Sequence, residues 1–213
     1  NDMGIKVVLS GEGADEIFGG YLYFRNAPTV EDFQKETIER VQKLFTADLL
    51  RADKSTMAHG LEARVPFLDK AFLDMAVRIK PEEKMPKTYD GKEKYILRKA
   101  FDTPDNPYLP DEVLWRQKEQ FSDGVGYNWI DQLIEYCSSQ VTDEQLAGAE
   151  DEFPYNTPTT KEAYFYRSIF NKYYPQVSAA QTVRKWIPKW QENQDPSGRA
   201  NAAHVQADVE IAK

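Results

Sequence analysis

Two carboxylates, Glu12 and Asp15, lie in a glycine-framed turn that directly follows an apolar run. The turn is Ser10-Gly11-Glu12-Gly13-Ala14-Asp15-Glu16, and the run before it, residues 5–9, is expected to be a β-strand. Where a strand passes through small residues into a helix, unpaired backbone N–H groups and the helix dipole favour an anion. Carboxylates suit such a place when a divalent cation or a cationic amine also binds there. The pattern indicates a nucleotide–metal site that handles an amine; the alternative is a tight turn whose acids cap the helix.

A second group of polar residues lies near the middle of the chain, in Trp115-Arg116-Gln117-Lys118-Glu119-Gln120-Phe121-Ser122-Asp123-Gly124-Val125-Gly126. Segments so rich in hydrogen-bonding side chains rarely serve only to connect helices. Its two glycines end regular structure, and we expect residues 119–126 to close over a bound nucleotide and to reopen. The segment is therefore a candidate functional loop that begins beside Lys118.

The strand at residues 5–9 is short and fully apolar, which is typical of an interior strand of a parallel sheet. We find no second convincing strand of this type in the sequence. Its partner strands are therefore expected upstream of Asn1, which would make the chain the rear part of a longer polypeptide.

Capping residues predict where three helices begin. Thr29 with Asp32 opens a long helix, Asp69 opens a second one, and Thr159 with Glu162 forms a capping box for an aromatic helix. Each pattern places a side-chain oxygen where the unpaired N–H groups of the first helical turn need an acceptor.

Helical spacing also predicts which side chains are buried. After Thr29 the core stripe is expected at Ile38, Val41, Phe45 and Leu49, and after Asp69 at Phe72, Leu73, Ala76 and Val77. Residues 59–69 are expected to form a loop. Within it, Glu62 and Arg64 are either solvated charges or a buried ion pair that holds the loop, and the apolar neighbours favour the pair.

The composition excludes several classes of partner. The 213 residues carry a net charge of -8, which argues against nucleic-acid binding and against an anionic membrane surface. One cysteine, Cys137, rules out a disulfide framework and fits the reducing cytoplasm. No apolar run approaches the length that crosses a membrane.

Several motifs, in order along nearly the whole chain, resemble the synthetase domain of the glutamine-dependent asparagine synthetases. They are Ser10–Glu16 with Phe18–Tyr21, Leu61–Asp69, Trp115–Gly124, Phe153–Pro158 and Trp186–Trp190. Two parts of that family are not in this sequence, namely the N-terminal glutaminase domain and the pyrophosphate-binding loop that begins the synthetase domain. Ala14 also replaces the serine that is more usual before the aspartate.

The resemblance implies a fold and a domain division. The fold class is α/β and mostly helical, of the adenine-nucleotide α-hydrolase-like (ATP pyrophosphatase) type, with one clear parallel strand at its start. Residues 1–175 would be the C-terminal part of the synthetase domain, and residues 176–213 a partly disordered C-terminal extension.

The resemblance also implies the chemistry. ATP transfers AMP to the side-chain carboxylate of aspartate and releases pyrophosphate, after which ammonia derived from glutamine attacks the acyl-adenylate. Glu12 would bind the ammonia and accept its proton, and Lys118 would stabilise charge on the transferring phosphoryl group. Asp15 would be a Mg²⁺ ligand, and Ser10, Gly11 and Gly13 would contact the nucleotide.

Two other functions stay open on the sequence. The first is a nucleotide-binding segment without activity of its own, and the chain by itself is expected to be inactive. The second is a β-lactam-synthetase-like enzyme, although those enzymes have a tyrosine where Glu12 stands. The expected partners are aspartate, ATP, ammonia or glutamine, and the glutaminase domain of the same polypeptide, in a cytoplasmic protein; a homodimer is left open.

Overall fold

The computed structural model describes residues 3–118 and 128–191. They separate into two compact units: residues 3–118 with 186–191 form unit 1, and residues 128–185 form unit 2. Helices make up most of both, and unit 1 also contains one pair of strands. The expected α/β class with mostly helical content is confirmed at this level.

The strand pair of unit 1 joins β1 (Val7–Leu9) to β2 (Glu62–Arg64) in parallel, with Val8 opposite Ala63. The prediction of a loop without a second strand over residues 59–69 is therefore wrong. β2 carries two charged residues around one alanine, so it lacks the apolar run that identifies a strand in a sequence. Both β1 and β2 lie at the surface, and Leu9 is 78% exposed, unlike an interior strand.

Helix α1 (Ala14–Ile17) follows β1 and is a single turn. Gly19 ends it with φ +59°, and a Cβ there would lie 2.5 Å from the Phe33 ring. A 3-10 helix at Leu22–Asn26 comes next and contributes Tyr23 and Phe24 to a buried aromatic cluster. The turn after β1 is thus anchored from both sides, by the sheet and by this cluster.

Helix α2 (Val30–Lys43) begins as predicted, because Thr29 accepts a hydrogen bond from the backbone N–H of Asp32. The predicted core stripe is only partly buried, since Ile38 is 38% exposed and Phe45 is 67% exposed. The buried face of α2 carries polar groups instead, in particular Glu36 and Arg40. Arg40 Nε lies 2.5 Å from Glu36 Oε1, so the two charges neutralise each other. A helix face that is hydrophilic in the sequence can therefore be buried.

Among the remaining helices of unit 1, α3 (Asp48–Met57) contacts β2 and α4 (Lys70–Arg78) contacts α1. Helix α3 leads into β2, and α4 follows a 3-10 helix at Pro66–Leu68. Asp69 caps α4 as predicted, by accepting from the N–H groups of Ala71 and Phe72. Helices α5 (Tyr95–Ala100) and α6 (Asp111–Leu114) precede Lys118.

Three residues of the predicted inner face of α4 are confirmed: Ala76 is buried with Ile17 and Phe18, and Phe72 and Leu73 pack against them. The fourth, Val77, is half-buried. The pair Glu62–Arg64 does form, at 2.8 Å, but both side chains are about 60% exposed. Its predicted burial is wrong, because the strand pair presents these side chains at the surface.

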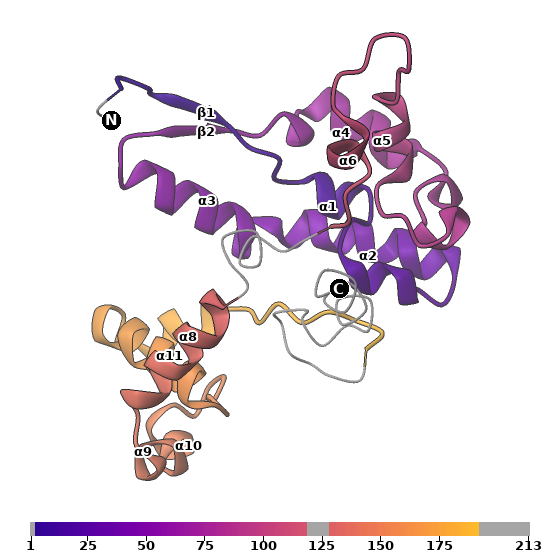
Figure 1. The fold of residues 1–213 in the computed structure, drawn as a ribbon. Coiled ribbons are helices and arrows are strands. Elements are labelled where there is room, and N and C mark those ends of the chain that lie inside the picture. The colour runs from indigo at the N-terminus through magenta and orange to yellow at the C-terminus, as the bar shows by residue number, and fades with distance from the viewer. Residues whose placement is uncertain (1–2, 119–127, 192–213) are drawn as a thin grey trace. The chain divides into compact units, whose positions relative to one another are not determined.

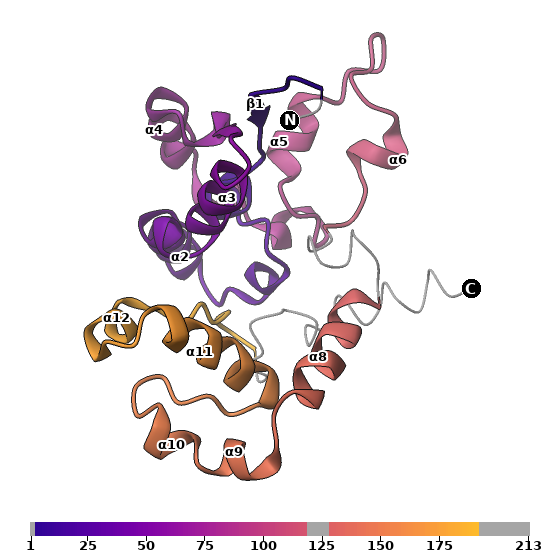
Figure 2. The same ribbon diagram turned by 90° about the vertical axis from the view of Figure 1, so that its left-hand side faces the viewer.

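Unit 2 consists of α8 (Trp129–Ser139), α9 (Asp143–Ala147), α10 (Ala149–Glu152), α11 (Lys161–Tyr173) and α12 (Val177–Thr182). Figure 2 shows α9 and α10 in the connection between α8 and α11, which pack on each other. Thr160, rather than the predicted Thr159, caps α11. Cys137 is buried on α8. None of the helices in the described parts of the two units combines the length and the apolar character needed to cross a membrane.

Candidate functional site

The turn between β1 and α1 is fixed by backbone contacts. The N–H of Ser10 donates to the carbonyl of Arg64 at 2.8 Å, and the N–H of Glu12 points at Ser10 Oγ at 3.3 Å. Gly13 has φ +94°, and a Cβ at this position would lie 2.6 Å from the side chain of Leu68. A side chain would also meet a backbone conformation that only glycine adopts easily. Around Gly11, in contrast, no atom of the described residues lies within 4 Å of where a Cβ would be, so they leave its backbone open to a ligand.

Glu12 is held by an arginine from α3. Its Oε1 lies 3.1 Å from Arg51 Nη2, and the same Arg51 nitrogen lies 3.3 Å from Asp48 Oδ1. Burial raises the pKa of Glu12 above its usual range, Arg51 opposes this rise, and the charge of Asp48 adds to it. A half-buried carboxylate of raised pKa can accept a proton more readily than an exposed one.

Asp15 lies in the first turn of α1, three residues after Glu12, and faces two lysines. Its Oδ1 accepts from Lys94 Nζ at 2.8 Å, and its Oδ2 lies 3.8 Å from Lys118 Nζ. Gly20 makes this arrangement possible, because a Cβ there would lie 2.1 Å from Asp15 Oδ1. The structure thus brings together two predicted site residues, Asp15 and Lys118, that are far apart in the sequence.

Lys118 is itself positioned by a buried acid. Its backbone N–H donates to Glu93 Oε1 at 2.6 Å, and Glu93 is 3% exposed. Arg25 and Arg98 pair with Glu93 at 3.1 and 3.0 Å, so its charge is neutralised from two sides. The start of the predicted functional loop is therefore attached to the turn that carries Glu12 and Asp15; residues 119–126 of that loop lie outside the described residues.

A second buried acid, Glu16, lies behind the turn. It accepts a hydrogen bond from the hydroxyl of Tyr21, which also lies 3.5 Å from Asp48 Oδ2. Burial raises the pKa of Glu16 to about 7. Burial and the neighbouring acids also raise the pKa of Tyr21, which therefore stays a hydrogen-bond donor.

Five residues of this site were not found from the sequence: Asp48, Arg51, Glu93, Lys94 and Tyr21. Lys94 offers one recognisable feature in the structure, because its φ of +54° is uncommon for a residue with a side chain. Such backbone strain is frequent at functional sites. In the sequence, Lys94 only follows Gly91 among other charged residues.

The acidic side chains of the site could supply only some of the ligands that a metal ion needs. Over residues 3–118 and 128–191, no cluster of three or more histidine, cysteine or acidic side chains forms a metal site. Mg²⁺ in nucleotide sites, however, often uses one or two carboxylates together with phosphate oxygens and water. Asp15, beside two lysines that suit phosphate, fits a site that a nucleotide would complete.

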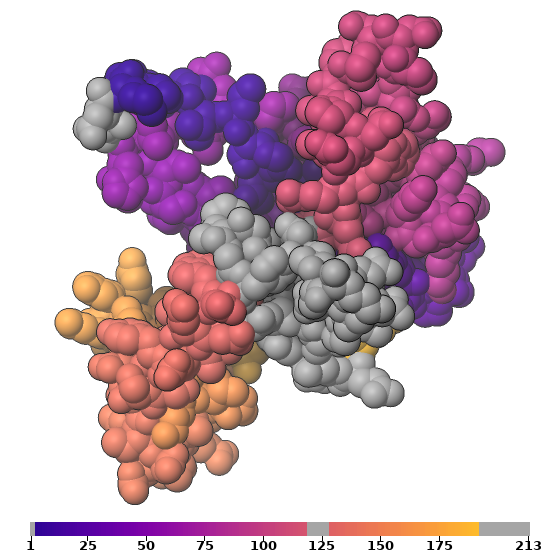
Figure 3. Space-filling model, in the orientation of Figure 1, coloured from indigo at the N-terminus to yellow at the C-terminus, as the bar shows by residue number. Residues whose placement is uncertain are grey.

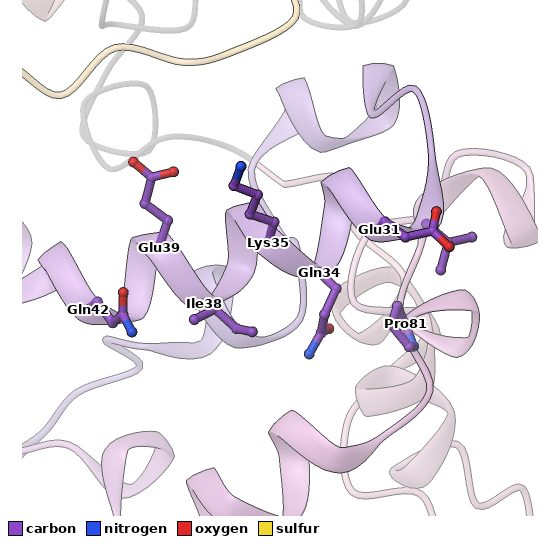
Figure 4. A pocket seen from close by; sticks show the side chains of 8 residues that line it. Glu31, Gln34, Lys35, Ile38, Glu39, Gln42 and Pro81 are labelled. Carbon is purple, nitrogen blue, oxygen red and sulfur yellow. The ribbon is translucent and has the colours of Figure 1, made fainter.

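A shallow depression of about 780 Å³ lies elsewhere, on the surface of α2 (Figure 4). Side chains along α2, from Glu31 to Gln42, line it together with Pro81. Its lining includes none of the predicted site residues, and its walls carry both acids and a lysine. We therefore do not associate it with the candidate site.

The comparisons with known proteins agree on one family. The sequence model of the family described as "Asparagine synthase" matches residues 1–37 and 25–195. The "Probable asparagine synthetase [glutamine-hydrolyzing]" of Dictyostelium discoideum is 57% identical over 208 residues, which cover 95% of this chain and 37% of that protein. The "Asparagine synthetase [glutamine-hydrolyzing] 1" of Saccharomyces cerevisiae is also 57% identical over 208 residues, covering 94% of this chain.

A similar relative occurs in plants. The "Asparagine synthetase, root [glutamine-hydrolyzing]" of Pisum sativum is 55% identical over 212 residues, which cover 93% of this chain and 36% of that protein. The chain thus spans little more than a third of the length of the curated relatives it matches.

Proposed function

The chain belongs to the asparagine synthase family, and on that premise we propose that it forms part of an enzyme that makes asparagine from aspartate, ATP and ammonia. The observation that carries the proposal is the pairing of Asp15 with both Lys94 and Lys118, three residues after Glu12 in the chain. Cations for phosphate and an acid for the amine are the groups that adenylation and amide formation require. The relatives' names support glutamine as the source of the ammonia.

The lysines act on the phosphate part of the reaction. Lys94 and Lys118 place two positive charges on opposite oxygens of Asp15. When the triphosphate of ATP binds, these charges stabilise the negative charge that builds up as pyrophosphate leaves the α-phosphorus. Asp15 would hold Mg²⁺, which neutralises phosphate charge when bound. Ser10, Gly11 and Gly13 present backbone to the nucleotide, and the open surroundings of Gly11 support a close approach.

Glu12 acts on the amine part of the reaction. The acyl-adenylate of aspartate is attacked by ammonia, whose nitrogen becomes positively charged as the new C–N bond forms. The Glu12 carboxylate, oriented by Arg51, attracts that charge and accepts the proton. AMP then leaves and asparagine remains.

The setting of the chain is part of the proposal. A glutaminase domain of the same polypeptide supplies the ammonia, and the fold is of the adenine-nucleotide α-hydrolase-like type, with residues 1–175 in the synthetase domain and 176–213 as an extension. The single cysteine supports a cytoplasmic location. The 213 residues by themselves should make no asparagine, because the pyrophosphate-binding loop of the family is not among them.

The test uses the natural polypeptide that carries this chain. With aspartate, ATP, Mg²⁺ and either ammonia or glutamine, we expect asparagine, AMP and pyrophosphate in equal amounts. Product identity is read by mass spectrometry, and omission of aspartate is the control. Pyrophosphate release that does not depend on aspartate, or a product other than asparagine, would refute the proposal.

A further inference from the structure

The segment Trp186–Trp190, which we name the strap, is tied to α2 by polar contacts. Lys189 Nζ lies 2.5 Å from Glu36 Oε2 and 2.6 Å from Glu39 Oε2. Arg40 Nη2 donates to the carbonyl of Ile187 at 3.0 Å. Glu36 is fully buried and the Lys189 side chain is partly exposed, so the contact ties the strap to a buried carboxylate of α2.

The two tryptophans of the strap share Tyr23 as a neighbour, each with ring centroids 5.9 Å away, and differ in the second aromatic ring that each contacts. Trp186 lies against Tyr21, with ring centroids 5.3 Å apart at 62°, and the guanidinium of Arg40 covers its ring at 4.6 Å. The second ring contacted by Trp190 is that of Phe24, with ring centroids 6.3 Å apart. Both tryptophans support the same cluster, but it is Trp186 that meets the ring whose hydroxyl reaches the candidate site.

From Tyr21 a continuous series of contacts leads to Glu12. The Tyr21 hydroxyl is shared between Glu16 and Asp48, Asp48 pairs with Arg51, and Arg51 pairs with Glu12. The Arg51 side chain is 57% exposed, so contact with Glu12 alone would leave both side chains mobile. The better-fixed group in the series is Tyr21, whose ring is packed on one side by Trp186 and stacked on Tyr23 at 6.1 Å.

We propose that Trp186 is a positioning residue for Glu12 and acts through Tyr21. By fixing the Tyr21 ring, it sets where the hydroxyl holds Asp48, and thus where Arg51 holds the carboxylate that receives the amine proton. The inference rests on the proposed function of Glu12. It makes amide formation depend on the strap, which lies more than 170 residues after Glu12 in the chain.

The test compares two strap variants in the natural polypeptide. Trp186→Ala should lower kcat for ammonia-dependent asparagine synthesis by about 10- to 100-fold, since small displacements of a reacting group have effects of this size. Trp190→Ala is the matched control, because it removes the same side chain from the same cluster, and it should lower kcat less than about 3-fold. KM for ATP should change little in both. Thermal unfolding of both variants measures any loss of stability that they share.

Coupling to Tyr21 separates positioning from a general structural role. Tyr21→Phe keeps the ring and removes the hydroxyl, so it should reproduce the kcat loss without the packing defect. If Trp186 acts through that hydroxyl, the double variant Trp186→Ala/Tyr21→Phe should have the same kcat as the less active of the two single variants. Trp186→Phe, which retains a ring beside Tyr21, should restore most of the activity.

Equal kcat losses in Trp186→Ala and Trp190→Ala would overturn the inference and leave the proposed function intact. Losses from Trp186→Ala and Tyr21→Phe that multiply in the double variant would do the same. An unchanged kcat in Trp186→Ala would overturn it as well. A wild-type polypeptide that forms no asparagine would instead reject the proposed function itself.

Discussion

Lys118 Nζ lies 3.8 Å from Asp15 Oδ2, while the backbone N–H of Lys118 bonds to the buried Glu93. The ammonium group is therefore placed beside the turn after β1 by two contacts, one to its side chain and one to its backbone. A surface lysine of a polar connecting segment would not be fixed in this way.

Lys118→Met tests the role of that charge. In the natural polypeptide it should slow aspartate-dependent pyrophosphate release on the order of 10²-fold in a single turnover, because it removes one preorganised charge where phosphoryl charge develops. ATP affinity, measured by titration, should fall much less. Lys161→Met, which removes a lysine paired with Asp143 in unit 2, is the control and should leave the rate unchanged. If ATP affinity instead fell by as large a factor as the rate of pyrophosphate release, Lys118 would contact ATP in the ground state and would have no special role in the transition state.

Gly20→Ala tests the close approach of Asp15. The added Cβ would lie 2.1 Å from Asp15 Oδ1 and 3.0 Å from Lys94 Cδ, so the Asp15–Lys94 pair must separate. Asparagine synthesis should fall by about 10²-fold, while glutamine hydrolysis by the same polypeptide persists. Gly148→Ala is the control, since its Cβ would meet only ordinary contacts at 3.6 Å or more. Normal synthesis by Gly20→Ala would show that the pair is not needed.

Glu16 predicts a pH dependence of stability. Its pKa is about 7 in the folded protein, above the ordinary value of 4.5 for a glutamate side chain, so the folded state binds the proton more tightly. Its contribution to the free energy of unfolding is therefore greatest below about pH 4.5 and is lost as the pH rises towards about 7. Glu16→Gln has no carboxyl proton to lose, so it does not share this loss of stability. The melting temperature of the variant minus that of wild type should therefore rise between about pH 5 and pH 8.

The control for Glu16 is Glu83→Gln, which alters an exposed acid that accepts a hydrogen bond from Tyr89. Its difference from wild type should show no comparable rise across the same pH range. A constant difference for Glu16→Gln as well would mean that Glu16 does not titrate in this interval.

The features that could be predicted from the sequence were mainly of two kinds: local structure such as helix caps, and site residues that belong to a family motif. The caps of Thr29 and Asp69 need only neighbouring residues, and both are confirmed. The meeting of Asp15 with the Lys118 segment was implied by the family resemblance. Neither kind of prediction depends on knowing how distant segments pack.

What could not be predicted depends on such packing. Arg51 reaches Glu12 from α3 and Lys94 reaches Asp15 from the turn before α5, and a lysine or arginine in a polar segment gives no indication of its partner. The buried face of α2 was misjudged because Glu36 and Arg40 satisfy each other's charge. β2 was missed because its strand character comes from backbone pairing with β1 rather than from apolar residues.

The most direct test of the account is Glu12→Gln in the natural polypeptide, with two readouts. The change keeps the size of the side chain and removes the negative charge and the proton acceptor. We expect aspartate-dependent pyrophosphate release in a single turnover to continue, while ammonia-dependent asparagine formation falls by about 10²- to 10⁴-fold. Asp74→Asn, which alters an exposed carboxylate paired with Arg78, is the control. Asparagine formation by Glu12→Gln at the wild-type rate would contradict the account.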